Sequence, residues 1–144
     1  MAAYARDILL VEDDAADALL IRDALAERGG ARAVTRVEDG IAALEHLRAP
    51  GASRPDLILL DLNMPRMNGH ELLGVLKADQ ALRTIPVVIL TTSESPVDVH
   101  RAYTGHANAY VVKPMTLTAF THAVRSIDEF FLDTAKTLGS GGFA

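Results

Sequence analysis

The 144-residue chain contains no cysteine. It therefore cannot form a disulfide scaffold, a cysteine-ligated zinc site or a thiol nucleophile. Its first residues lack a basic stretch followed by an apolar core, so we expect no signal peptide. No apolar run approaches the roughly 18 residues that would span a bilayer. These absences predict a cytoplasmic protein that does not associate with a membrane.

Positive charge is also scarce, with 14 Lys and Arg against 19 Asp and Glu and a net charge of −5. An acidic chain repels phosphate backbones, so we expect no nucleic-acid binding. The content of 49% hydrophobic and 23% charged residues is typical of globular proteins and excludes disorder over most of the length. The length predicts one domain. We place it at residues 7–138, followed by a flexible, glycine-rich tail at residues 139–144.

Three short runs consist entirely of aliphatic residues: 8–11, 57–60 and 87–90. Such runs are typical of strands that are buried on both faces of a parallel sheet. Weaker runs at residues 33–37 and 109–112 predict two edge strands. Helical patterns fill every gap, so strand and helix alternate along the chain. This alternation predicts an α/β fold with a doubly wound, five-stranded parallel sheet and right-handed crossovers.

The expected helices carry recognisable start and stop signals. Gly29-Gly30 is a stop signal for the first helix, and Asp39 is a candidate N-cap for the second. The third helix follows the turn at Asn68-Gly69, and Ser95-Pro96 offers the fourth an N-cap with proline in the first helical position. The last helix begins near Thr116 and is expected to be unusually long.

Polar residues follow the buried strands. Glu12-Asp13-Asp14 comes after the first, Asp61 ends the third, Thr91-Thr92-Ser93 follows the fourth and Lys113 follows the fifth. In an open α/β sheet the ligand site lies beyond the carboxyl ends of the strands, so these side chains should converge. Two carboxylates about 4 Å apart repel by roughly 4 kcal/mol at an effective dielectric near 20, which favours a bound cation. Oxygen ligands beside a phosphoryl group suit Mg²⁺.

One carboxylate stands apart from the others. An aspartate that ends a wholly aliphatic strand is unfavourable unless it has partners, which makes Asp61 the candidate nucleophile for a phosphoryl group. For Asp14 the plainer interpretation is a helix N-cap. Taken singly, Thr91 reads as a turn hydroxyl and Lys113 as a solvated charge, so the interpretation depends on their coincidence at one edge of the sheet.

Four motifs in the same order resemble the receiver domain of bacterial two-component response regulators. They are Val11-Glu12-Asp13-Asp14, Leu60-Asp61-Leu62-Asn63-Met64-Pro65 with Asn68-Gly69, Leu90-Thr91, and Tyr110-Val111-Val112-Lys113-Pro114. The resemblance covers about residues 7–128 and implies a flavodoxin-like receiver fold with strand order 2-1-3-4-5. It implies a domain that takes a phosphoryl group from a sensor histidine kinase and catalyses only its own phosphorylation and dephosphorylation.

The resemblance also implies a role for each acidic residue. Asp61 is expected to be the phosphoacceptor, and Glu12 and Asp13 the acidic pair that binds Mg²⁺. Asp13 would be a direct ligand, and Glu12 would act through water. Asp61 itself and the backbone carbonyl of Asn63 would complete the protein's share of the coordination.

Other positions resemble the family's switch and phosphoryl-binding residues. Lys113 is expected to bind the phosphoryl group, with a cis peptide before Pro114 to aim it. Thr91 is expected to be the switch hydroxyl and Tyr110 the switch aromatic. Their movement would signal through the face formed by the fourth helix, the fifth strand and the fifth helix.

Three positions are expected to control hydrolysis of the phosphorylated aspartate. Thr92 is bulkier than the alanine often found in the family, while Ser93 and Asn63 carry no charge to orient water. We therefore expect slow dephosphorylation.

A finer resemblance is to stand-alone regulators of phytochrome-type histidine kinases, so a bacteriophytochrome is a candidate partner. It is carried by Leu62-Asn63-Met64-Pro65, Ile85-Pro86-Val87-Val88 and Leu90-Thr91-Thr92-Ser93, together with a long loop before the third strand. The last helix is expected to run past Leu132 and to build a homodimer. Its apolar stripe is Leu117, Phe120, Val124, Ile127, Phe131 and Leu138, with Phe130 beside it. Folding of this extension onto its own domain is the alternative.

Two other functions remain open from the residues alone. A Mg²⁺-dependent phosphatase with an aspartate nucleophile would carry a second acidic residue two positions further on, where this chain has Asn63. A binding module that works without phosphorylation would need none of this chemistry. A flavin or dinucleotide binder is disfavoured, because Glu12-Asp13-Asp14 stands where a glycine-rich turn would be required.

Overall fold

The computed structural model describes residues 6–26, 32–136 and 138. The five strands are β1 (Arg6–Val11), β2 (Arg32–Val37), β3 (Leu57–Leu60), β4 (Val87–Thr91) and β5 (Ala109–Val112). The helices are α1 (Ala15–Ala26), α2 (Gly40–Arg48), α3 (Gly69–Ala78), α4 (Pro96–Thr104) and α5 (Leu117–Asp128), followed by a π-helix, η1 (Glu129–Thr134). The predicted stop at Gly29-Gly30 and the predicted tail at residues 139–144 lie outside the described residues.

The sheet has the predicted topology, with all strands parallel in the order β2-β1-β3-β4-β5. The three aliphatic runs form the central strands β1, β3 and β4, where both faces are covered. The weaker runs form the edge strands β2 and β5, which are only partly buried. An uninterrupted aliphatic run needs apolar neighbours on both faces, which only central positions provide.

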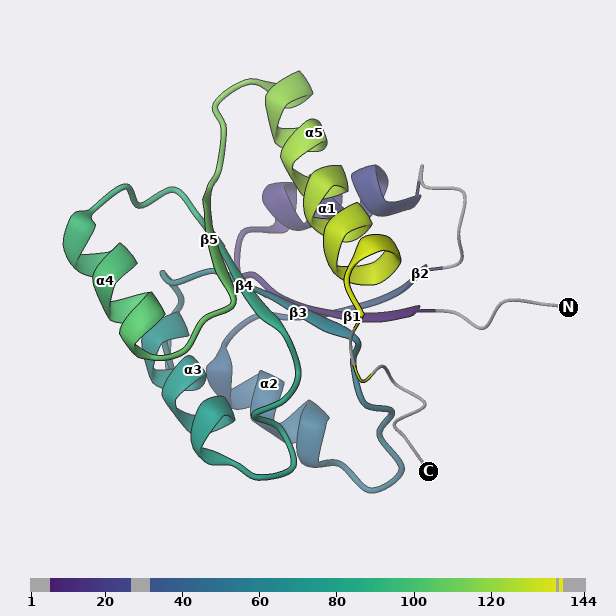
Figure 1. Cartoon of the computed structure of the whole chain (residues 1–144), viewed down its shortest axis with the longest axis vertical. Helices are drawn as coiled ribbons and strands as arrows, with labels where there is room; N and C mark the ends of the chain where they lie inside the picture. The colour runs from purple at the N-terminus through teal and green to yellow at the C-terminus, as the bar shows by residue number, and fades with distance from the viewer. Residues whose placement is uncertain (1–5, 27–31, 137, 139–144) are drawn as a thin grey trace, which may run out of the picture.

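Helices cover the sheet on both sides (Figure 1). Helices α1 and α5 pack on one face, and α2, α3 and α4 pack on the other. Successive strand residues point to opposite faces, so Leu9 and Ile58 enter the core under α2 and α3, while Ile8 and Leu57 enter the core under α1 and α5. No helix in the described ranges is both long and apolar enough to cross a bilayer.

The predicted N-caps begin the helices as expected. Side chains of Asp39, Ser95 and Thr116 each accept a hydrogen bond from the backbone three residues later. Asn68 goes further and forms a capping box with Glu71 at the start of α3. These caps set where each helix starts relative to the strand before it, and so fix the loops at the carboxyl edge of the sheet.

The last helix runs past Leu132 as predicted, but its final turns are a π-helix rather than an α-helix. A π-turn holds more residues than an α-turn. The core position that follows Ile127 is therefore Leu132, which is 1% exposed, while Phe131 is only partly buried. The predicted stripe left out Leu132, and Phe131, which it assigned to a face for a second copy, packs partly against the core of its own domain.

A buried ion pair lies at the junction of α5 and η1. The Arg32 guanidinium, at the start of β2, donates to the fully buried Asp128 carboxylate at 2.7 Å and to Asp133 at 3.1 Å. The pair holds the end of α5 against the edge strand β2. Part of the extension thus folds onto its own domain, while Phe130 remains 54% exposed.

Candidate functional site

The loop after β1 presents the acidic pair. Glu12 is 1% exposed, and its amide donates to the carbonyl of Val37 on β2. Asp13, one residue later, is exposed. The Arg36 guanidinium on β2 donates to the carbonyl oxygens of both acidic residues at 3.0 Å, which fixes their backbone. The outcome is one acid held inside the molecule and one at its surface.

Asp61 follows the last residue of β3 and meets this pair, because β1 and β3 are neighbours and parallel. Its amide donates to the carbonyl of Val11 at 3.0 Å, and its Oδ1 accepts from the Leu62 amide at 2.8 Å. The residue is buried, with 8% of its surface exposed. An unsolvated carboxylate of this kind needs compensating charge close by.

The start of α3 packs directly on the backbone of Asp61. The Gly69 amide donates to the carbonyl of Leu62 at 3.0 Å. A Cβ on Gly69 would collide with the carbonyl oxygen of Asp61 and lie 2.7 Å from the Cα of Leu62. Glycine at this position lets the helix approach close enough to fix where Asp61 ends the strand.

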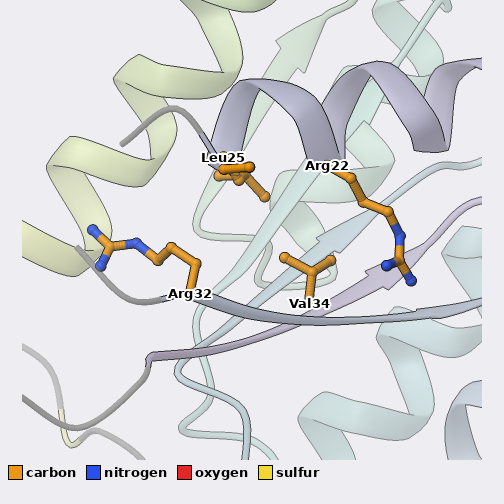
Figure 2. Close-up of a pocket in the computed structure, with 5 residues that line it drawn as sticks. Arg22, Leu25, Arg32 and Val34 are labelled. Carbon is orange, nitrogen blue, oxygen red and sulfur yellow. The ribbon is translucent and has the colours of Figure 1, made fainter. Parts of the chain in front are cut away.

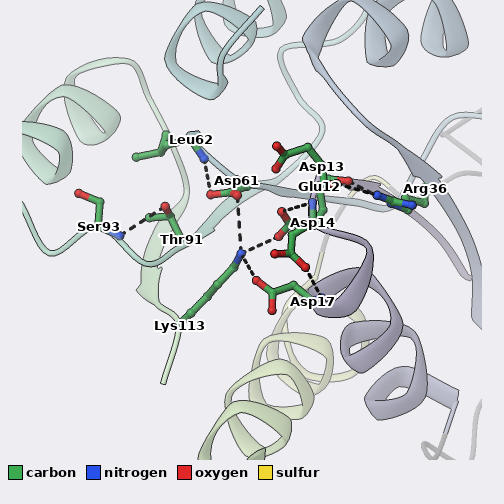
Figure 3. Close-up of polar contacts among 10 residues, drawn as sticks. All are labelled: Glu12, Asp13, Asp14, Asp17, Arg36, Asp61, Leu62, Thr91, Ser93 and Lys113. Carbon is green, nitrogen blue, oxygen red and sulfur yellow. Dashed lines mark hydrogen bonds and ion pairs between the residues drawn. The ribbon is translucent and has the colours of Figure 1, made fainter. Parts of the chain in front are cut away.

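Lys113 brings the compensating charge from β5 (Figure 3). Its Nζ donates to Glu12 Oε1 at 2.6 Å and to Asp17 Oδ2 at 2.8 Å, and it lies 3.6 Å from Asp61 Oδ2. The predicted cis peptide before Pro114 was wrong, because no peptide bond in the described segments is cis. A trans bond is the intrinsically favoured form and here already brings the ammonium to the carboxylates.

Burial and charge act together on these groups. Burial raises the pKa of the Glu12 carboxyl to about 7 despite the lowering effect of Lys113, and the charge of Asp61 adds to the rise. Burial lowers the pKa of Lys113, but hydrogen bonds to Asp17 and Glu12 outweigh this, so the pKa is raised overall. The ammonium therefore stays charged at neutral pH.

Glu12, Asp13 and Asp61 each place one carboxylate oxygen within 4.8 Å of an oxygen of the other two. Three carboxylates of mixed exposure, next to an open edge, fit a small, hard cation that keeps some of its water. Asn63, the other predicted ligand, is exposed in the loop after Asp61. It lines a pocket of about 470 Å³ together with Asp13, Leu62, Met64, Asn68, His70, Asp98 and Arg101.

The switch and hydrolysis candidates lie on the other side of Asp61. Thr91 ends β4 with no exposed surface, and its Oγ1 accepts from the Ser93 amide at 3.5 Å. Tyr110 is partly buried, and its hydroxyl donates to the carbonyl of Ser93 at 2.9 Å. The Ser93 hydroxyl donates to Asp98 at 2.6 Å. Thr92, which lies between Thr91 and Ser93 in the chain, is exposed.

Two residues that take part in the polar contacts of this site were not predicted from the sequence. Asp17, which holds Lys113, lies in the first turn of α1, where nothing in the sequence distinguishes it from an ordinary acidic residue at a helix start. His70, on α3, is the other: its Nε2 lies 3.1 Å from Asp98 Oδ1, and so continues the chain of contacts from Ser93. Nothing in the sequence marks His70 as a member of this network, because α3 and α4 meet only in the folded chain.

A second pocket, of about 380 Å³, lies between α1 and β2 (Figure 2). Arg22, Leu25, Ala26, Arg32 and Val34 line it. It is at the end of the sheet where β2 begins, away from the carboxylates. Arg32 is already engaged by Asp128 and Asp133, so its charge is not free for a ligand. This pocket is not the candidate site.

Comparisons with known proteins identify the family of this chain. Residues 8–125 match the response regulator receiver domain family. The chain belongs to this family. It is therefore a signalling domain of the two-component type, as the sequence motifs predicted.

Relatives of this receiver domain include the probable methanogenesis regulatory protein FilR2 of Methanothrix harundinacea, which is 42% identical over 92% of this chain and 87% of FilR2. The phosphorylated cyanobacterial phytochrome response regulator RcpA is 42% identical, with a TM-score of 0.90 over 93% of this chain and 99% of RcpA. The Mn²⁺-bound form of the response regulator Rcp1 is 38% identical, with a TM-score of 0.86 over 92% and 98% of the two chains.

Two glycines of α3 provide a matched test of how the receiver site is built. Gly69→Ala forces a Cβ into the Asp61 backbone and should lower the free energy of unfolding by about 1–3 kcal/mol. Gly74→Ala, where nothing lies within 4 Å, should raise it by about 0.5–1 kcal/mol. Urea unfolding measures both. Equal effects of the two changes would contradict the close approach of α3 to Asp61.

Proposed function

We propose that this receiver domain accepts a phosphoryl group on Asp61 from a sensor histidine kinase. The observation that carries the proposal is the Asp61 carboxylate, grouped with two acids within 4.8 Å and lying 3.6 Å from the Lys113 ammonium. A bacteriophytochrome is the proposed kinase, because RcpA is described as a phytochrome response regulator. We place the reaction in the cytoplasm and the receiver domain at residues 7–138.

The chemistry follows from these residues. An Asp61 oxygen attacks phosphorus, the bond from phosphorus to the donor histidine nitrogen breaks, and its electron pair returns to the imidazole, which takes up a proton. Lys113 and the Thr91 hydroxyl then hold the oxygens of the new acyl phosphate. The domain acts on no separate substrate and turns over only its own phosphoryl group.

Glu12, Asp13, Asp61 and the backbone carbonyl of Asn63 are the proposed Mg²⁺ ligands. The grouping of the three carboxylates supports this assignment, as does the existence of an Mn²⁺-bound form of Rcp1. A bound Mg²⁺ supplies positive charge that offsets the repulsion between the incoming phosphoryl group and the carboxylates. Asp13, which is exposed, would be reached by the ion directly.

Phosphorylation is proposed to draw the Thr91 hydroxyl toward Asp61 and to change the packing of Tyr110. The contacts that would transmit this movement run through Ser93, whose amide meets Thr91 and whose carbonyl meets Tyr110. Movement of Thr91 therefore alters the loop that begins α4. The signalling surface is the face formed by α4, β5 and α5.

Slow hydrolysis of the acyl phosphate is proposed from the same loop. The Ser93 hydroxyl is engaged by Asp98, and Asn63 is a neutral amide, so neither supplies a charge that would orient attacking water. Thr92 is exposed next to Ser93 in the chain, and its branched side chain narrows the path by which water would reach the acyl phosphate on Asp61.

Replacing the acceptor tests the function directly. Asp61→Asn keeps the shape of the side chain but lacks the nucleophilic carboxylate, so incubation with Mg²⁺ and acetyl phosphate should add no phosphoryl group. Intact-protein mass spectrometry measures this. Asp14→Asn is the control, because Asn caps a helix as well as Asp does, and it should be phosphorylated like the unchanged chain. Full phosphorylation of Asp61→Asn would refute the assignment.

A homodimer through the C-terminal helix region is also proposed. Phe130 is 54% exposed and packs edge-on against Phe131, with ring centroids 5.1 Å apart. Two adjacent aromatic rings at the end of a helix form an apolar patch that a second copy would cover.

Two variants separate dimerisation from folding. Phe130→Glu should yield monomers in sedimentation velocity at micromolar concentration. Leu132→Ala should leave the dimer intact but lower the free energy of unfolding by about 2–5 kcal/mol, because it leaves a cavity in the core. An unchanged chain that sediments as a monomer would contradict the dimer.

A further inference from the structure

Asp17 contacts the Lys113 ammonium from outside the predicted site. It lies in the first turn of α1, and its Oδ2 accepts from Lys113 Nζ at 2.8 Å. Its amide donates to Asp14 Oδ1 at 2.9 Å, which fixes the residue at the start of the helix. Figure 3 shows Asp17 and Asp61 on different sides of the ammonium. Asp17 thus pulls Lys113 away from the acceptor.

The three carboxylates around Lys113 hold it unequally. Glu12 and Asp17 accept hydrogen bonds at 2.6 and 2.8 Å, whereas Asp61 at 3.6 Å is only an ion-pair partner. The Lys113 side chain is 5% exposed, so water is poorly placed to replace a lost partner of the ammonium. To contact a phosphoryl oxygen on Asp61 closely, Lys113 has to loosen one of its two short bonds.

Burial decides which bond loosens. The Glu12 side chain is 1% exposed, so water is poorly placed to replace the ammonium as its hydrogen-bond partner. The Asp17 side chain is 27% exposed, so water can solvate its carboxylate once the ammonium has turned away. The Asp17 bond is therefore the one that gives way.

We propose that Asp17 is a positioning residue that competes with the phosphoryl group on Asp61 for the Lys113 ammonium. This inference rests on the proposed function. The Asp17 carboxylate keeps the Lys113 ammonium away from Asp61 while Asp61 is unmodified. Because the hydrogen bond between Lys113 and Asp17 must break when a phosphoryl group binds, its strength is subtracted from the affinity of the site for that group. Removing the Asp17 charge releases Lys113 to the phosphoryl group.

Beryllofluoride with Mg²⁺, a non-covalent mimic of the phosphoryl group, tests this by calorimetric titration. Asp17→Asn should bind the mimic about three- to tenfold more tightly than the unchanged chain, as expected for a partly exposed charged hydrogen bond. Asp14→Asn removes the same charge from the same helix start. Within the described residues Asp14 shares no hydrogen bond or ion pair with Lys113. This control should change the affinity by less than about twofold.

A double-mutant comparison separates the contact from general charge effects. In a Lys113→Gln background, Asp17→Asn should have no more effect than Asp14→Asn, because the competition is gone. Equal effects of the two changes with Lys113 present would overturn the proposal, as would weaker binding by Asp17→Asn. If Lys113→Gln does not fold, the comparison of Asp14→Asn with Asp17→Asn in the chain that keeps Lys113 decides the proposal. Failure of the unchanged chain to bind the mimic would instead count against the proposed function.

Discussion

The contact between one ammonium and three carboxylates is the constraint on which the rest of this site depends. Lys113 follows the edge strand β5, yet it reaches acids that follow β1 and β3 and an acid in α1. A parallel sheet allows this because all its strands end at one edge. The ion pairs therefore connect segments about 50 to 100 positions apart in the chain, and they surround Asp61, the proposed acceptor.

The central part of the fold could be predicted from the sequence because its causes are local. The aliphatic runs of β1, β3 and β4 require two covered faces, and caps such as Asp39 and Ser95 mark where helices start. The grouping of Glu12, Asp13 and Asp61 was predicted from their positions just after two parallel strands. Each of these features depends on neighbours in the sequence, or on the rule that parallel strands end together.

What escaped prediction depends on contacts between distant residues. The π-turn places Leu132 in the core, and the buried pair of Arg32 with Asp128 lies at that turn. No local pattern announces such a change of period. Asp17 also reads as an ordinary acidic residue of a first helical turn, until the fold brings Lys113 to it. Its role is visible only in three dimensions.

A chain of polar contacts extends from Thr91, at the end of β4, toward the surface helices. Thr91 meets the Ser93 amide, the Ser93 hydroxyl meets Asp98, and Asp98 meets His70 on α3. The Ser93 hydrogen bond and the His70 contact hold the pKa of Asp98 below its usual range. These contacts connect the end of β4 to both α3 and α4.

Chemical trapping of the phosphorylated residue tests the central claim most directly. Borohydride reduces an acyl phosphate to an alcohol and so converts an aspartyl phosphate into homoserine, which peptide mass spectrometry locates in the chain. After incubation with Mg²⁺ and a phosphodonor, the account predicts homoserine at position 61 and none when the metal is chelated beforehand. Homoserine at another aspartate, or at position 61 regardless of chelation, would contradict it.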